Sequence, residues 1–244
     1  MGVFAAGEDR VYDTIASRAV ADTMTAAEQV VALRRAAHDL VSARNQYLGS
    51  VPNSGIRGRW FGSADYSLLK GGGCGHYVVV LTRLLHRAGF EARIAQMLCE
   101  DTSYGACHIV AEAKVGERWV VLDPLYDHAF RAPDGTLASY AEVSAHWDRY
   151  VAQVPPDYRR MYNYNDVRYT NWSKIPVLLP AARAVLGWVV EDADTLSIRA
   201  GVLNLYRTYA YLLLGMELVL LVGTVLWVRR RWTRGSEGAD TDPA

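Results

Sequence analysis

Cys74 stands between three glycines and a long apolar run, in the segment KGGGCGHYVVVLTRLL of residues 70–85. The apolar run predicts a buried helix that begins near Cys74 and ends before Gly89. A thiol at a helix N-terminus lies among backbone N–H groups without helical partners, at the positive end of the helix dipole. Both favour the thiolate, which is the nucleophilic form. The pattern therefore predicts a reactive cysteine, with the N–H of Gly75 as a candidate donor to an oxyanion.

A nucleophilic thiolate needs a base, and the base needs a group that orients it. His108 opens one predicted strand, and Asp123 closes the next, directly before Pro124. In an antiparallel meander, the start of one strand and the end of the next lie at the same edge, so the two side chains can be neighbours. If the helix begins at that edge, Cys74 completes a set in which the thiolate attacks, His108 moves the proton and Asp123 fixes the tautomer.

Three segments alternate between apolar and polar residues as strands do: EARIAQMLC at 91–99, CHIVAEAKV at 107–115 and RWVVLD at 118–123. A turn at Gly116 and Glu117 joins the last two. The order of a helix followed by this meander predicts an α+β fold.

Two further helices are predicted from capping boxes, in which a side-chain oxygen and a glutamate three residues later satisfy each other's backbone N–H groups. Thr25 and Glu28 begin the first, which continues with apolar residues at helical spacing and places His38 on a solvated face. Ser139 and Glu142 begin the second, SYAEVSAHWDRYV at 139–151.

The segments GGGCGHYVVVLTRLLHRAGFEARI and CHIVAEAKVGERWVVLDP resemble the core of the transglutaminase-like family, over about residues 71–124. The resemblance implies a papain-like α+β fold with the Cys-bearing helix packed on an antiparallel sheet. It also implies a thiol acyl-transfer site without a cofactor, acting on a protein or peptide-like amide. By position, Cys74 would be the nucleophile, His108 the base and Asp123 the orienting group.

The sequence departs from that pattern in two places. Ile109 follows the histidine, where the family often has tryptophan. Leu68 lies six residues before the nucleophile, where papain-like enzymes have a glutamine that donates to the oxyanion. The indole N–H of Trp60 is a candidate replacement, and a loop aromatic that only packs is the alternative.

The remaining cysteines leave alternatives open. Cys99 and Cys107 flank a loop and could form a disulfide or remain two free thiols. The histidine and cysteine positions match no zinc spacing, and Cys107 and His108 point to opposite faces of a strand, so we expect no metal site. His76 lies on a different face of its helix from Cys74, and we interpret it as structural.

The segment YAYLLLGMELVLLVGTVLWV, residues 209–228, is nearly all apolar and long enough to cross a hydrocarbon core of roughly 30 Å. Four arginines follow it closely: Arg229, Arg230, Arg231 and Arg234. This pattern predicts a single-pass membrane helix in contact with lipid, with its basic C-terminal flank in the cytoplasm and the catalytic domain outside. Glu217 near its middle is a candidate contact for a membrane partner.

These features divide the chain into a transglutaminase-like domain at 1–170 with its core at 25–152, a connector at 171–208, the membrane helix at 209–228 and a polar tail at 229–244. The Tyr- and Arg-rich segment that starts at Val154 could line a cleft or bind a glycan or peptide, or it could lie at the domain surface near the bilayer, where Tyr, Trp and Arg favour the interface. The surface position is the favoured one. A net charge of zero gives no reason to expect a nucleic-acid partner. The leading hypothesis is a membrane-anchored thiol enzyme acting on amide bonds. The alternative is a catalytically silent binding or assembly module of the cell envelope.

Overall fold

The computed structural model describes residues 2–48, 72–98, 107–172, 178–190, 192–201 and 205–237. Its elements, in chain order, are α1 (Gly2–Ala19), α2 (Ala26–Leu48), α5 (Cys74–Arg87), β1 (Ala92–Leu98), β2 (His108–Val115), β3 (Arg118–Leu122), α6 (Tyr140–Ala145), α7 (Trp147–Tyr150), η1 (Val151–Gln153), α8 (Pro156–Met161), β4 (Asp166–Arg168), α9 (Leu178–Leu186), η2 (Ala193–Thr195), α10 (Ile198–Gly201) and α11 (Leu205–Glu237).

The sheet is antiparallel, with the strand order β3-β2-β1-β4. The predicted meander of three strands is confirmed. The fourth strand is an addition, since β4 comes from the Tyr- and Arg-rich segment and pairs Val167 with Met97 of β1. The mixture of helices with this antiparallel sheet confirms the α+β class.

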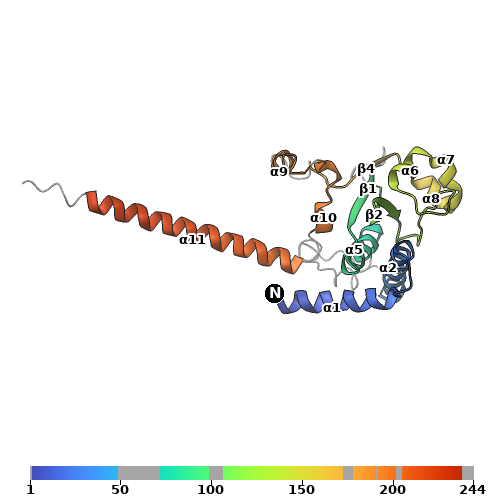
Figure 1. Cartoon of the computed structure of the whole chain (residues 1–244), viewed down its shortest axis with the longest axis horizontal. Helices are drawn as coiled ribbons and strands as arrows, with labels where there is room; N and C mark the ends of the chain where they lie inside the picture. Colours follow the sequence, from blue (N-terminus) through green and yellow to red (C-terminus); the bar gives the residue numbers. More distant parts are fainter. Residues whose placement is uncertain are drawn as a thin grey trace, which may run out of the picture.

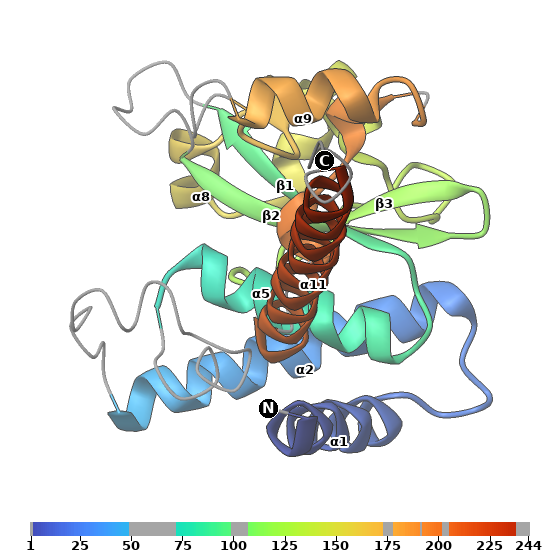
Figure 2. The ribbon, with the colours of Figure 1, turned by 90° about the vertical axis from the view of Figure 1, so that its left-hand side faces the viewer.

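One face of the sheet is covered by α1, α2 and α5, which lie together below the strands in Figure 2. Their apolar side chains form what we call the aliphatic cluster, whose fully buried members include Val30, Leu33, Leu81, Leu84 and Ile94. The helix that begins at Cys74 and ends before Gly89 is confirmed as α5.

The capping box at the start of α2 is also confirmed, because Thr25 and Glu28 bond each other's backbone N–H groups. The expectation that His38 lies on a solvated face is wrong. Its ring is half-buried, and its Nδ1 lies 2.9 Å from the carbonyl oxygen of Pro124. The helical period placed His38 on the polar side of α2, but the chain after β3 returns to cover that side.

The other face of the sheet is covered by α6, α7, α8 and the loops around them. This side carries the aromatic cluster, whose buried rings are Phe130, Tyr140, Tyr150, Tyr158 and Tyr164. The expectation that the Tyr-rich segment lies at the surface is wrong for Tyr158 and Tyr164, which are both 0% exposed.

The predicted capping box of Ser139 and Glu142 is confirmed at the start of α6. The helix is shorter than expected, because His146 leaves helical geometry (φ −132°, ψ 38°) and α7 begins as a separate turn.

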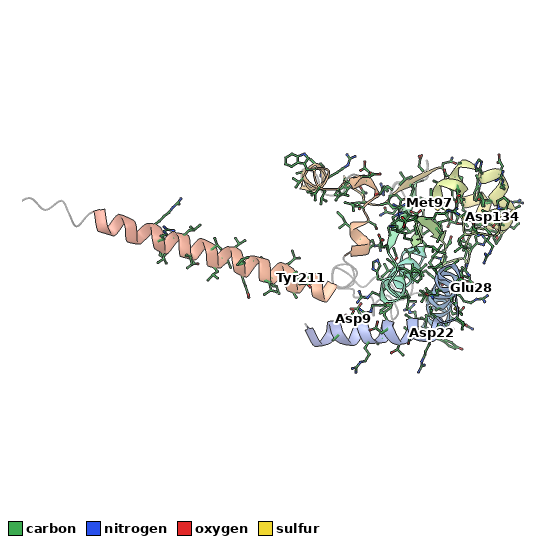
Figure 3. All side chains as sticks on the ribbon, viewed as in Figure 1. Asp9, Asp22, Glu28, Met97, Asp134 and Tyr211 are labelled. Atoms are coloured by element: carbon green, nitrogen blue, oxygen red, sulfur yellow. The ribbon has the colours of Figure 1, made fainter. Side chains whose placement is uncertain are left out.

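Beyond the sheet, α11 leaves the domain as one helix of 33 residues (Figure 1). Its residues 209–230 are apolar enough, and the helix long enough, to span a membrane, in agreement with the predicted segment 209–228. Figure 3 shows Tyr211 at the end of this stretch nearest the domain. Leucines and valines along the helix are exposed, for example Leu212 at 59% and Val219 at 72%.

Candidate active site

Cys74 is the first residue of α5 and is a half-buried free thiol. The glycines before it have a local cause. Gly73 is the N-cap residue, in extended geometry with φ −76° and ψ −164°. A side chain at Gly72 would collide with the ring of His76, so the close approach of this ring requires glycine there. The ring of His76 thus lies close to Gly72, in the segment before the helix.

His108 and Asp123 are brought together at one edge of the sheet. The register aligns Ala111 with Leu122, so the start of β2 and the end of β3 lie at the same edge. Side chains alternate between the two faces, and His108 shares its face with Val110, as Asp123 does with Val121. The Nε2 atom of His108 lies 2.6 Å from Oδ2 of Asp123, and both residues are 1% exposed.

The carboxylate of Asp123 is held by four donors. Its Oδ1 accepts hydrogen bonds from the backbone N–H groups of Leu125 and Tyr126, at 3.0 and 3.3 Å. Its Oδ2 accepts from His108 and from the hydroxyl of Tyr158, the latter at 2.9 Å. These donors satisfy the polar atoms of the buried carboxyl group and fix its orientation.

Three tyrosine rings surround the imidazole of His108. Tyr162 stacks on it with ring centroids 4.3 Å apart, and Tyr126 and Tyr158 meet it edge-on. The hydroxyl of Tyr158 also lies 2.7 Å from that of Tyr164. Burial raises the pKa of Tyr158 and of Tyr162, so their hydroxyls stay protonated.

Sequence reasoning assigned none of these tyrosines to the site. For Tyr158, Tyr162 and Tyr164 the density of tyrosine after Val154 was the available signal, and lining a cleft was one of the two alternatives for that segment. Tyr126 carried no such signal.

Burial and charge act in opposite directions on the thiol and the imidazole. Burial lowers the pKa of His108, but the charge and hydrogen bond of Asp123, and then the nearby thiol of Cys74, outweigh it and raise this pKa to about 9. Burial raises the pKa of Cys74, but His108 and the backbone N–H groups of Ile109 and Gly75 outweigh it, so this pKa is lowered. Both shifts act toward a thiolate beside an imidazolium.

The two ring nitrogens of His108 are not equivalent. Nε2 is hydrogen-bonded to Asp123, and the buried Nδ1 makes no hydrogen bond to another described residue. Nδ1 is therefore the nitrogen that remains for the thiol of Cys74, which is near enough to shift the pKa of the ring. Hydrogen bonds between catalytic groups are often long in the absence of substrate.

A family model described as the transglutaminase-like superfamily matches residues 13–124. This region is a transglutaminase-like domain. It runs from α1 to Pro124 and includes Cys74, His108 and Asp123, whereas α6 to α11 lie beyond the match. Members of this superfamily are generally cysteine-dependent enzymes, and the fold is suited to thiol-dependent acyl transfer or hydrolysis. No curated protein and no solved structure matches the chain.

The other sequence-predicted residues of the transglutaminase-like domain have mixed outcomes. Gly75 follows Cys74 in the first turn of α5, and its N–H is among the groups that lower the pKa of the thiol. Trp60 and Cys99 lie outside the described residues. Cys107 is disulfide-bonded, which agrees with the bridged alternative for that cysteine. Within the described ranges, no group of three or more histidine, cysteine or acidic side chains could hold a metal ion.

Proposed function

We propose that this chain is a membrane-anchored thiol enzyme that acts on amide bonds, with Cys74 as nucleophile, His108 as general base and acid, and Asp123 as the group that orients His108. One observation carries the proposal. The imidazole is bonded to Asp123 through Nε2, its Nδ1 makes no hydrogen bond to another described residue, and Cys74 is near enough to raise the pKa of the ring.

In the first step, the sulfur of Cys74 forms a bond to the carbonyl carbon of an amide, and the electron pair of the C=O bond moves to the oxygen. The oxyanion then re-forms the carbonyl as the C–N bond breaks, and His108 gives its proton to the departing nitrogen. This leaves an amine and a thioester on Cys74.

In the second step, a nucleophile resolves the thioester. Neutral His108 takes a proton from the incoming nucleophile, which attacks the carbonyl carbon, and Cys74 leaves as a thiolate. With water the product is a carboxylic acid, and the enzyme is a protease or amidase. With an amine the product is a new amide, and the enzyme is an acyl transferase.

The backbone supplies candidate donors for the oxyanion. The N–H groups of Gly75 and Ile109 both act on the sulfur of Cys74, so they lie near the position where a tetrahedral oxygen would form. Trp60 stays a prediction as a further donor.

For the membrane, we propose that α11 is a single-pass anchor and that the domain lies outside the cytoplasm. The arginines that follow the apolar stretch favour a cytoplasmic C-terminus. The disulfide at Cys107 supports an oxidising compartment for the domain. The chain after α9 exposes Trp188 at 87% and Val189 at 83%, which suits contact with the membrane interface. Glu217 remains a candidate contact for a membrane partner.

The test of the enzyme proposal is the rate at which iodoacetamide alkylates Cys74 as a function of pH, read by mass spectrometry on the full chain in detergent. We expect Cys74 to react well below pH 8 and to lose that advantage in His108→Gln. His146→Gln is the matched control, since His146 is an exposed histidine of the same domain, at the junction of α6 and α7.

The opposite result is a Cys74 that titrates as a free thiol near pH 8.5 and is indifferent to His108. That result would overturn the enzyme proposal and favour a silent binding or assembly module instead.

A further inference from the structure

The connector does not simply link the domain to α11, because α10 packs against the domain beside the helix that bears Cys74. Ala200 is 4% exposed and belongs to the aliphatic cluster. The hydroxyl of Ser197 accepts a hydrogen bond from the N–H of Ile94 at 3.0 Å, and Thr170 bonds Leu196 and Ile198. These contacts fix the position of Arg199, between Ile198 and Ala200.

The guanidinium group of Arg199 lies against the first turn of α5. A Cβ placed on Gly75 would have Nη2 of Arg199 as its nearest neighbour, at 3.6 Å. Gly75 directly follows Cys74, so the cation lies beside the helical turn that bears the thiol. The two groups interact, since packing on the domain lowers the pKa of Arg199 while the charge of Cys74 raises it.

Three other arginines that pack on the domain each have a carboxylate partner. Arg34 pairs with Asp127, Arg83 with Asp9, and Arg93 with Glu112. Arg199 packs on the domain but keeps part of its surface exposed to solvent, and it has no acidic partner within the described part of the chain. A guanidinium group presents five N–H donors in a planar fork that matches a carboxylate. The donors of Arg199 are therefore available to a ligand at the reactive thiol.

We propose that Arg199 is a specificity-determining residue that binds a carboxylate of the substrate, about one residue from the amide that Cys74 attacks. Adjacent Cα atoms of a peptide are about 3.8 Å apart, and the same spacing separates Cys74 from Gly75, on which the guanidinium rests. The proposal rests on the proposed function. It implies that the juxtamembrane segment, and not only the domain matched to the family, selects the substrate.

Two alkylating reagents of nearly equal size test this without a known substrate. Iodoacetate carries a carboxylate next to the carbon that reacts with the thiol, and iodoacetamide carries a neutral amide there. We expect the ratio of the iodoacetate rate to the iodoacetamide rate at Cys74 to fall about tenfold or more in Arg199→Gln, because a charge-assisted bidentate pair is lost. Arg199→Lys should keep part of the preference.

The iodoacetamide rate tests the proposed function, and the ratio of the two rates tests the role of Arg199. A Cys74 that is not activated toward iodoacetamide would defeat the proposed function, whatever the ratio. An activated Cys74 whose ratio stays within about twofold of wild type in Arg199→Gln would overturn only the role of Arg199. Arg149→Gln, a change at an exposed arginine of α7, is the matched control and should leave both rates unchanged.

A protection assay then identifies the source of the carboxylate. Short N-acetylated peptides are offered against iodoacetamide in three forms: with a free C-terminal carboxylate, with a C-terminal amide and a glutamate side chain, and with neither. Protection by the first form in wild type but not in Arg199→Gln indicates a terminal carboxylate, and the same result for the second form indicates an acidic side chain. If neither protects better than the neutral peptide, the substrate carboxylate is ruled out.

Discussion

The two faces of the sheet are covered by different kinds of core. On one face, α1, α2 and α5 contribute aliphatic side chains such as Leu81 and Leu84. On the other, short helices and loops contribute aromatic rings, several of which carry hydroxyl groups. The thiol of Cys74 comes from a helix on the aliphatic side, whereas His108 and its partners lie among the aromatic rings.

The difference indicates a division of labour. Packing on the first face is mainly aliphatic, although Tyr12 and Tyr77 also belong to it, so it holds α5 on the sheet and supplies stability chiefly through buried apolar area. The aromatic side buries Asp123 and His108 and must satisfy their polar atoms, which it does partly through Tyr158. We therefore expect substitutions on the first face to change mainly stability, and substitutions on the second to change mainly the chemistry of the thiol.

The largest loss of stability is expected for Leu81→Ala in the aliphatic cluster. Leu81 is 0% exposed, so the substitution removes buried methyl groups and leaves a cavity. We expect the free energy of unfolding to fall by about 2–5 kcal/mol, measured by urea denaturation in detergent. Val11→Ala, at a valine of α1 that is 46% exposed, should cost less than about 0.5 kcal/mol. Equal costs at the two positions would contradict the assignment of Leu81 to the core.

The next largest effect is a dependence of stability on pH, and it arises only on the aromatic side of the sheet. In Cys74→Ala, the pKa of His108 is still raised by Asp123. A histidine whose pKa is higher in the folded state stabilises the fold fully below its unfolded pKa of about 6.5, and this contribution disappears as the pH rises through the folded pKa. The free energy of unfolding of Cys74→Ala should therefore fall above pH 6.5, by about 1.4 kcal/mol per unit of pKa shift.

The matched comparison is Cys74→Ala combined with Asp123→Asn, which removes the charge that raises the pKa of His108. The difference in unfolding free energy between the two variants should shrink as the pH increases from 6 to 9. A difference that is constant over this range would show that Asp123 does not hold the charge on His108.

Tyr158→Phe should have a smaller effect on stability and a clear one on reactivity. The substitution removes a donor to Asp123 and the hydroxyl that lies 2.7 Å from that of Tyr164, while it keeps the ring. The expected cost is about 1–3 kcal/mol, because buried polar atoms lose a partner. With less support for Asp123, the pH at which Cys74 is half-alkylated should also shift in Tyr158→Phe.

Tyr150→Phe is the control for this prediction. Tyr150 is 2% exposed in the same aromatic cluster, but it is not part of the hydrogen-bond network around Asp123. Its substitution should leave the pH dependence of alkylation unchanged. If both variants shift that dependence equally, the packing of the rings matters and the hydroxyl of Tyr158 does not.

The difference between the two faces of the sheet also explains how much of the structure the sequence could predict. The alternation of residues in the three strands and the apolar run of the helix at Cys74 are local patterns. They are enough to predict that Cys74, His108 and Asp123 lie at one edge of the sheet. The rings of Tyr158 and Tyr162 come from a segment without a period, and β4 has only three residues. Arg199 reaches Gly75 across more than a hundred residues of sequence, and no local pattern encodes such a contact.

The smallest effect is expected at the helix caps, where the two faces should behave alike. Ser139 caps α6 on the aromatic side, and Thr25 caps α2 on the aliphatic side, each with a glutamate three residues later. Substitution of either by alanine should cost about 1 kcal/mol and leave the alkylation of Cys74 unchanged, because a cap satisfies only the backbone of its own helix. If Ser139→Ala lowers the free energy of unfolding much more than Thr25→Ala does, the helix ends contribute to the difference between the two faces. If the two losses are similar, the difference between the faces lies in their cores, which are mainly aliphatic on one side and rich in tyrosine rings on the other.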